Sequence, residues 1–203
     1  MNQEQFQKAA GVSAGLAARW FPHIDAAFKE FGVTAPVDQA MFIAQAGHES
    51  AGFSQLVENF NYTPAALVTT FGKRITKYQA DMLGRVNSRA ANQQAIANLV
   101  YGNRLGNRAS NEGWQYRGRG LIQITGRDNY RKCGDALKLD LVSCPDYLEG
   151  EHHAVRSALW FYTNSGCLLY SGDVYRVTQI INGGQNGIED RRVRYSRARA
   201  ALL

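Results

Sequence analysis

The chain has 203 residues, of which 45% are hydrophobic and 20% charged, so it is long enough to bury a core and is not intrinsically disordered. Its formal net charge of +6 favours polyanionic surroundings such as nucleic acid, anionic lipid or an anionic cell wall, and charge alone does not choose among them. No apolar run is long enough to span a bilayer, and the N-terminal residues form no secretory signal, so neither a membrane-spanning nor a signal-directed protein is expected.

Apolar residues recur at helical spacing along most of the chain, which predicts a mainly α protein. Residues 3–31 are expected to be helical, with breaks near residues 11–13 and at Pro22. Start signals at residues 34–36 precede a helix that leads to Glu49. Residues 62–110 are rich in Ala, Gln and Asn and predict a smaller helical lobe within a single domain of residues 1–203. The helices after residue 60 are expected at Pro64–Phe71, Thr76–Leu83, Ala91–Tyr101, from Asp128 onward, and at Glu151–Tyr162, Val174–Ile181 and Glu189–Leu203.

One segment departs from the helical pattern. Leu121, Gln123 and Thr125 alternate with Ile122 and Ile124, and this period of two predicts a short strand or extended segment. One face of that segment is expected to be buried, and the other is expected to present Gln123 and Thr125.

Three cysteines, Cys133, Cys144 and Cys167, are widely spaced and odd in number. They fit a protein made in a reducing compartment better than a disulfide scaffold. Each is expected to be a small buried hydrophobic residue, and a disulfide between Cys133 and either of the others stays open.

Two glutamates bracket a glycine-containing loop in residues 46–59. Gln45 and Glu49 are four residues apart, so they share one face of the predicted helix. Glu58 has apolar neighbours, among them Leu56 and Phe60, that are expected to bury it in part. One partly desolvated carboxyl and one solvated carboxylate form the pair needed for acid/base cleavage of a glycosidic bond, whereas two ordinary surface glutamates are the alternative.

Other readings of the motifs fail on spacing. A zinc-protease helix needs a histidine three residues after Glu49, and that position is Gly52. The adjacent His152 and His153 point in different directions on a helix and do not favour a metal site. Residues 117–120 (Arg-Gly-Arg-Gly) lack the Lys-Ser/Thr of a phosphate-binding loop and are not repeated. No spacing supports a Cys–His hydrolase, and no metal or other cofactor is predicted.

Three blocks of the sequence together resemble glycoside hydrolase family 19, the chitinase-like family. They are residues 47–53 (GHESAGF), 116–126 (YRGRGLIQITG) and 180–184 (IINGG), in the family's order. The similarity is greatest to endolysins of phages that infect Gram-negative bacteria. This resemblance implies a lysozyme-like, two-lobed helical fold with at most a short β element and a substrate cleft between the lobes.

The resemblance also implies residue roles. Glu49 matches the general acid, Glu58 the general base, and Thr125 the residue that helps to hold the attacking water. The positions that match substrate-contacting residues are His48, Tyr116, Gln123, Asn129, Asn182 and Arg191, the last resembling an arginine near the acid in plant members. Inversion with such a pair requires carboxyl groups about 6.5–9.5 Å apart. Leu121 replaces a plant proline, Asn186 falls near a plant glutamate whose place Glu189 could take, and the plant disulfides are absent.

The function implied is hydrolysis of the peptidoglycan glycan backbone, between N-acetylmuramic acid and N-acetylglucosamine, by a phage protein that lyses its host. Such a protein is expected to be a monomer, to reside in the host cytoplasm before lysis and to act on the wall in the periplasm. A chitinase and a catalytically silent wall-binding domain are the alternatives. Nucleic-acid binding rests only on the positive charge and is not expected.

The predicted C-terminal helix is basic, and its arginines are open to two readings. They either form a solvated face that closes the fold or weakly attract the helix to the anionic bacterial envelope, and the two roles are compatible. The arginines are Arg191, Arg192, Arg194, Arg197 and Arg199.

Overall fold

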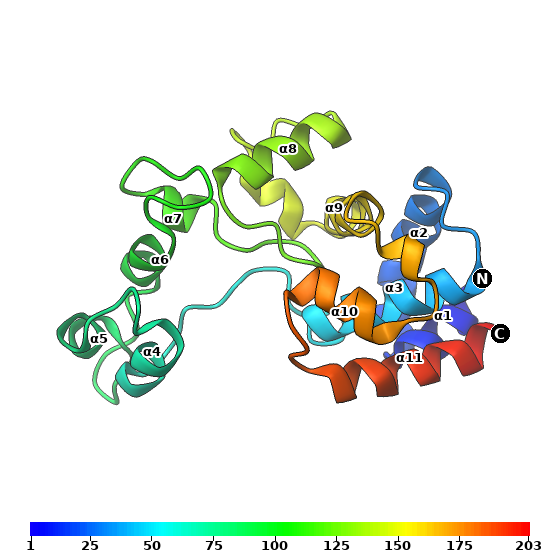
Figure 1. The fold of residues 1–203 in the computed structure, drawn as a ribbon, viewed down its shortest axis with the longest axis horizontal. Coiled ribbons are helices and arrows are strands. Elements are labelled where there is room, and N and C mark those ends of the chain that lie inside the picture. The colour runs from blue at the N-terminus through cyan, green and yellow to red at the C-terminus, as the bar shows by residue number, and fades with distance from the viewer. The chain divides into compact units, whose positions relative to one another are not determined.

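The structure, a computed structural model, describes all residues from 1 to 203 and is built from helices without a β-sheet, which confirms the predicted mainly α class (Figure 1). The chain divides into two compact units, each assembled from separate stretches. Unit 1 comprises Met1–Leu56, Arg119–Gln123 and Asp146–Leu203, and unit 2 comprises Val57–Gly118 and Ile124–Pro145. The smaller lobe predicted at residues 62–110 lies within unit 2, and the single-domain reading stays a prediction. No helix has the length and apolar character needed to cross a bilayer.

Unit 1 holds the N-terminal and C-terminal helices of the chain. The first residue of the 3-10 turn η1, Pro145, belongs to unit 2, and its remaining residues belong to unit 1. The elements are α1 (Gln3–Ala10), α2 (Ala14–Glu30), α3 (Pro36–Glu49), η1 (Pro145–Glu149), α9 (Glu151–Asn164), the 3-10 turn η2 (Cys167–Tyr170), α10 (Val174–Asn182) and α11 (Ile188–Leu202).

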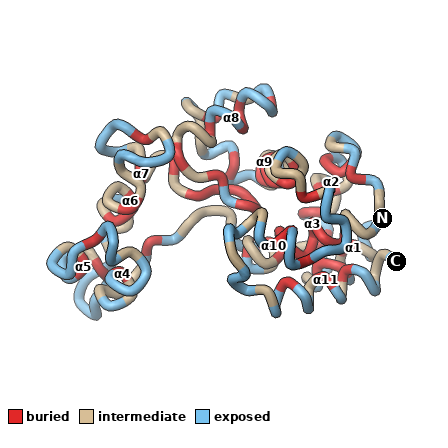
Figure 2. The backbone as a smooth tube through the Cα atoms, in the orientation of Figure 1, coloured by how far each residue is buried: buried red, intermediate tan, exposed pale blue.

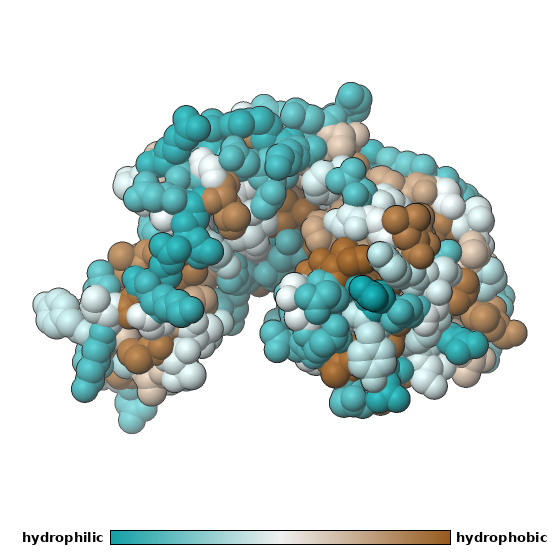
Figure 3. Space-filling model, in the orientation of Figure 1, coloured by the Kyte–Doolittle hydropathy of each residue, from teal (hydrophilic) through white to brown (hydrophobic).

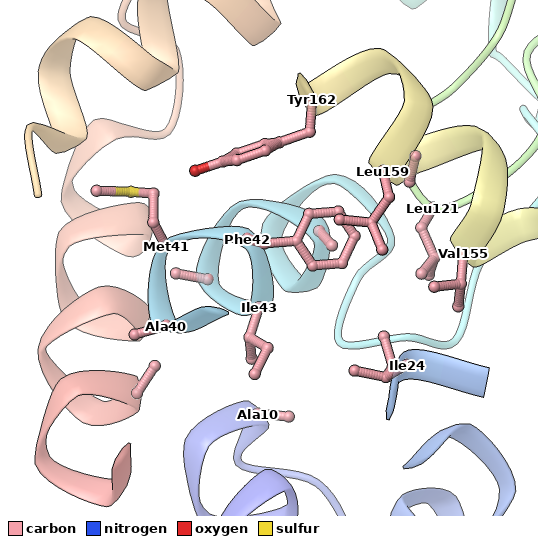
Figure 4. Close-up of a cluster of buried hydrophobic side chains, with 14 of the residues drawn as sticks. Ala10, Ile24, Ala40, Met41, Phe42, Ile43, Leu121, Val155, Leu159 and Tyr162 are labelled. Carbon is pink, nitrogen blue, oxygen red and sulfur yellow. The ribbon is translucent and has the colours of Figure 1, made fainter. Parts of the chain in front are cut away.

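Helix α3 is the centre of unit 1. Residues 40–47 of α3 are all buried, as expected for a helix that is covered on every side (Figure 2). Phe42 and Ile43 point to different sides, and α9 contributes Leu159 and Tyr162 to the same cluster (Figure 4). Helix α11 packs along α3. Because Glu49 is the last residue of this enclosed helix, its position is set by the core of unit 1.

The predicted break at Pro22 is wrong. Helix α2 runs through Pro22 from Ala14 to Glu30, whereas the predicted break between α1 and α2 is present at residues 11–13. A proline inside a helix removes one hydrogen bond and costs about 3 kcal/mol. Trp20 and Ile24 flank Pro22 and are both buried, so packing on the two sides of the proline offsets the lost bond.

A tight turn follows Glu49. The Ser50 hydroxyl donates to the carbonyl of Ala46 and accepts from the Phe53 amide. Residues 51–53 all have positive φ, including Phe53 at 65°, a strained conformation for a non-glycine residue. The buried Phe53 ring and a hydrogen bond from the Trp20 indole to the Phe53 carbonyl, at 3.0 Å, hold the turn in place. The end of α3 is therefore rigidly fixed.

Unit 2 contains five helices: α4 (Pro64–Phe71), α5 (Lys77–Leu83), α6 (Gln93–Tyr101), α7 (Glu112–Gln115) and α8 (Arg127–Leu137). Thr63 caps the N-terminus of α4 and Pro64 is its first residue, and the helix starts and ends as predicted. The visible surface of α8 is largely hydrophilic (Figure 3). A small core joins α4, α5 and α6 and consists of Phe60, Leu67, Ile75, Ala80, Ile96, Ala97 and Val100.

The strand predicted at residues 121–125 is wrong. Residues 121–123 form a turn, and Gly120 just before them has a φ of 95°. Leu121 and Ile122 are both buried although they are neighbours, so the segment has no single buried face. Alternation over five residues is too short a signal to exclude a buried turn.

Candidate active site

Glu49 ends α3 and forms an ion pair with Arg191 in the first turn of α11. The Arg191 guanidinium is 1% exposed and donates from Nη2 to Oε1 of Glu49. The Glu49 side chain keeps 23% exposure, so Oε2 is left to face solvent or a ligand. Arg191 thus lies beside Glu49, as predicted, and its burial argues against the direct contact with substrate that was also predicted for it.

A buried polar chain orients Arg191. Gln45, one turn before Glu49 on α3, accepts from Nη1 of Arg191 through Oε1. Its amide nitrogen donates to the Thr178 hydroxyl of α10 at 3.1 Å, and both Gln45 and Thr178 are fully buried. Arg191 also donates from Nε to the Asn186 carbonyl at 3.2 Å. Each charged or polar group is thereby paired, which is the condition for keeping them in a core.

His48, predicted to contact substrate, is tied to α11 instead. Its Nδ1 lies 2.7 Å from Oδ2 of Asp190, which also accepts from Arg194 at 2.6 Å. Although burial opposes the effect, the bonds from Arg194 and His48 hold the pKa of Asp190 below its ordinary value. A side chain at Gly187 would overlap the His48 imidazole, so the glycine allows this close approach. His48 therefore joins α3 to α11 beside Glu49, and its direct contact with substrate stays a prediction.

Glu58 lies in unit 2 and is held by the backbone of Gly118. The amide of Glu58 donates to the Gly118 carbonyl at 2.9 Å, and the Gly118 amide donates to Oε2 of Glu58 at 3.1 Å. This reciprocal pair joins Glu58 to the second motif block.

Tyr101, the last residue of α6, holds the Glu58 carboxylate from the other side. Its hydroxyl lies 2.9 Å from Oε1 and 3.1 Å from Oε2 of Glu58. Burial raises the pKa of Glu58 above that of an ordinary glutamate, and the hydrogen bonds from Tyr101 and Gly118 oppose this only in part. The partial burial predicted from Leu56 and Phe60 is therefore present.

Sequence reasoning missed Tyr101 and the residue behind it, Asn107. Asn107 is 2% exposed; it donates to the Tyr101 carbonyl at 2.9 Å and accepts from the Arg127 amide at 2.9 Å. It thus joins the end of α6 to the start of α8, next to Thr125. No local motif marks either residue, because their partners lie far away in sequence.

Thr125 lies in unit 2, immediately before α8, and is half-buried. Its carbonyl accepts from the Asn129 side chain at 2.8 Å, and no hydrogen bond joins its side chain to Glu58. Gln123, in unit 1, and Asn182, the last residue of α10, are both exposed. The predicted roles of these four residues toward water and sugar stay predictions.

Tyr116 corrects the predicted set. It is 3% exposed, and its hydroxyl donates to the Val142 carbonyl at 3.0 Å. Its ring packs at 5.4 Å, centre to centre, on the buried Tyr130. Because both the ring and the hydroxyl are used inside unit 2, Tyr116 is a core residue and not a substrate contact.

The arginines of α11 serve mostly within unit 1. Arg191 pairs with Glu49, Arg192 with Glu189 and Arg194 with Asp190, whereas Arg197 donates to the carbonyls of Ala9 and Ala10 at the end of α1. This agrees with the reading of a face that closes the fold. Attraction of the helix to an anionic envelope stays a prediction.

Glu49 in unit 1 and Glu58 in unit 2 differ in their chemical surroundings. The carboxylate of Glu49 forms an ion pair with Arg191, whereas that of Glu58 accepts from a phenol and a backbone amide, is partly desolvated, and feels the charge of Arg117 without an ion pair to it. Two carboxyl groups in contrasting environments suit opposite proton-transfer roles. No group of three or more His, Cys, Asp or Glu side chains in the structure is placed to hold a metal ion. None of the three cysteines forms a disulfide, and burial raises the pKa of the Cys167 thiol to about 12.

Comparison with known proteins gives matches along the sequence. The family model of class I chitinases matches residues 85–169. A glycosyl hydrolase family 19 domain-containing protein of Haemophilus influenzae is 41% identical in an alignment of 184 residues that covers 84% of this chain and 87% of that protein. Chitinase 11 of Oryza sativa subsp. japonica is 50% identical over 48 residues, 23% of this chain and 19% of the rice protein.

Solved structures share the fold. A bacterial family 19 chitinase superposes with a TM-score of 0.60 at 19% identity, covering 99% of this chain and 94% of that one. Chitinase C of Streptomyces griseus superposes with a TM-score of 0.62, also at 19% identity, over 99% of this chain and 76% of that one. At such identities the structural likeness establishes the fold alone. The similarity to the Haemophilus protein, however, extends along most of both chains, and it shows that this chain is a glycosidase that belongs to glycoside hydrolase family 19.

Proposed function

We propose that this family 19 glycosidase is an endolysin that hydrolyses the glycan backbone of bacterial peptidoglycan with inversion and so lyses its host. The observation that carries the proposal is the contrast between Glu49, in contact with Arg191, and Glu58, desolvated and held by Tyr101 and Gly118. The basic character of the chain agrees with a polyanionic wall as substrate.

In the proposed reaction Glu49 is the general acid and Glu58 the general base. Glu49 donates its proton to the glycosidic oxygen as the bond to the anomeric carbon breaks. A water, held by the Thr125 hydroxyl, attacks that carbon from the opposite face and gives its proton to Glu58. Arg191 contacts Oε1 of Glu49, so the proton is carried on Oε2, and the guanidinium stabilises the carboxylate that forms. Exchange with solvent then restores both carboxyl groups.

A raised pKa makes Glu58 a stronger base, provided that it is ionised at the working pH. The donors Tyr101 and Gly118 favour the ionised form. Substrates with different leaving groups distinguish this assignment from the opposite one, in which Glu58 is the acid and Glu49 the base. An activated 4-nitrophenyl glycoside needs little acid assistance, so Glu49→Gln should lose about 10³-fold on ordinary glycans and far less on the activated substrate. Glu58→Gln should lose activity on both, and the reverse pattern would exchange the two roles.

The substrate is tested on intact cell wall. Turbidity of outer-membrane-permeabilised Gram-negative cells should fall after the protein is added and stay constant with Glu49→Gln. Lysis by Glu49→Gln equal to that of the unmodified chain would remove Glu49 from the reaction.

A chitinase is the second candidate, favoured by the match to the class I chitinase model over residues 85–169. Hydrolysis of soluble N-acetylglucosamine oligomers at rates comparable with those on peptidoglycan would support it. Binding to purified sacculi without released sugar would instead indicate a catalytically silent wall-binding domain.

We also propose that the protein is a monomer, accumulates in the host cytoplasm and reaches the periplasmic wall at lysis. Fractionation of producing cells, before and after the inner membrane is permeabilised, tests the location. Light scattering of the purified chain tests the monomer.

A further inference from the structure

A basic pocket lies beside the residue that holds the proposed base. It occupies about 810 Å³ in unit 2, between the ends of α4 and α6. We define the basic pocket by its polar lining residues, which are Thr69, Thr70, Lys73, Arg74, Tyr101 and Arg104. Because Tyr101 lines the pocket and its hydroxyl contacts Glu58, a single phenol ring joins the pocket to the carboxylate.

The three cations of the basic pocket have no acidic partner. Lys73 and Arg74 are exposed and form no ion pair or side-chain hydrogen bond within the chain. Arg104 is exposed and donates only to the Val100 carbonyl, at 3.3 Å. Two other cations of unit 2 do have acidic partners: Arg127 pairs with Glu112 and Arg131 with Asp128, each at 3.3 Å. The pocket therefore offers uncompensated positive charge to a ligand.

The charge of the whole chain is concentrated in the same unit. Unit 2 holds 12 of the 23 basic residues and 6 of the 17 acidic residues, so the net charge of +6 belongs to unit 2, and unit 1 is balanced at 11 and 11. The basic C-terminal helix lies in unit 1, where acidic residues elsewhere in the unit balance its positive charge. The field that attracts an anion thus comes from the unit that carries Glu58 and the basic pocket.

We propose that the basic pocket binds the carboxylate groups of the peptide branch that a peptidoglycan strand carries, and so selects this substrate over chitin. Chitin is a neutral polymer, whereas the muramic acid of peptidoglycan carries a lactyl ether and a peptide with free carboxylates. A carboxylate of that branch would accept from Lys73 and Arg74, and the Thr70 hydroxyl would donate to a further oxygen, whereas the Thr69 hydroxyl already donates to the Ala65 carbonyl. The inference rests on the proposed function, because it assigns a substrate group to a site beside the proposed base.

Binding is measured with the inert Glu49→Gln variant, so that cleavage does not consume the ligand. The probes are a soluble muropeptide with free carboxylates, the same compound with its carboxylates converted to amides, and a neutral N-acetylglucosamine oligomer. The test variant adds Lys73→Gln and Arg74→Gln. The matched control adds Arg85→Gln and Lys132→Gln, two exposed cations of the same unit that do not line the pocket.

The test variant should bind the muropeptide about fivefold to tenfold more weakly at low salt, since two exposed ion pairs are lost. The control should stay within about twofold of the unmodified pocket. The amidated compound should bind both proteins with the same reduced affinity, and the neutral oligomer should not distinguish them. Thermal unfolding of each variant checks that the fold is retained.

Equal affinity of the test variant and the control for the muropeptide would overturn the basic pocket as its binding site and leave the proposed cleavage of peptidoglycan untouched. Weaker binding by the test variant, together with no fragments released from peptidoglycan by the unmodified chain, would support the pocket and refute the proposed function. The measurements therefore separate a wrong binding site from a wrong proposed function.

Discussion

Replacing Tyr101 by phenylalanine tests how the protein sets the protonation of Glu58. The substitution removes the hydroxyl that lies 2.9 Å and 3.1 Å from the two carboxylate oxygens, and it keeps the ring that packs on Phe60. Because the hydroxyl stabilises the ionised form, its loss raises the pKa of Glu58 further above the ordinary value. The neighbouring Gly118 amide remains as a donor.

The size of the effect follows from the strength of one hydrogen bond. A bond to a charged group contributes about 1.5–3 kcal/mol, and the lower end applies because water can replace part of it at this half-buried site. About 1.4 kcal/mol corresponds to a tenfold change in the ionised fraction. If Glu58 is the base, kcat/KM of Tyr101→Phe should fall about tenfold on the acidic side of the pH profile and change little on the plateau.

The assay is the initial rate of reducing-end formation across pH at fixed ionic strength. Tyr78→Phe is the control, since Tyr78 is 74% exposed in the same unit and should leave the profile unchanged. A Tyr101→Phe profile that superimposes on the unmodified one would refute the role of the hydroxyl. A uniform loss at every pH would indicate that Tyr101 contacts substrate, and a gain on the alkaline side would make Glu58 the acid.

Three further predictions concern stability. Burial raises the pKa of Glu58 in the folded state, so the contribution of Glu58 to stability is present below the unfolded pKa and is lost as pH rises through the folded pKa. Glu58→Gln should therefore raise the Tm at pH 7 by about 2 °C and leave it unchanged at pH 3. A lower Tm of Glu58→Gln at pH 7 would contradict this. A lysine at position 191 cannot donate to Gln45 and Glu49 at once, so Arg191→Lys should lower the free energy of unfolding by about 3 kcal/mol in urea titrations. The control, Arg192→Lys at an exposed position, should change it by less than about 0.5 kcal/mol. Equal effects of the two substitutions would contradict the stabilising role of the buried network. Gly183 and Gly187 both have φ above 70°, but only a side chain at position 187 would overlap His48. Gly187→Ala should therefore destabilise the protein by about 1 kcal/mol more than Gly183→Ala. Identical unfolding curves of the two variants would show that His48 is free to move.

Helices were predictable wherever local chemistry decides their ends. Thr63 caps α4, Pro64 occupies its first position, and a glycine follows Phe71, so the bounds of α4 can be read directly from the sequence. The same logic fails at Pro22, because the burial of Trp20 and Ile24 is a property of the folded unit. It also fails at residues 121–123, where a buried turn mimics alternation.

The site was predictable only in part. Glu49 was found in the first motif block and Arg191 through its resemblance to an arginine of plant members, and the structure brings the two together. Tyr101 could not be found, because it lies 43 residues from Glu58 and has no local signal of its own. Tyr116 was assigned to the substrate because it belongs to a motif block, yet membership in a block does not fix the direction of a side chain. The concentration of net charge in unit 2 also depends on which residues the fold groups together.

Mass analysis of the fragments that the protein releases from purified peptidoglycan identifies the bond that is cut. We expect disaccharide-peptides with new reducing ends, each enriched in the inverted anomer when first released, and none with Glu49→Gln or Glu58→Gln. Fragments cut only in the peptide, or no fragments from a wall that the protein binds, would contradict it.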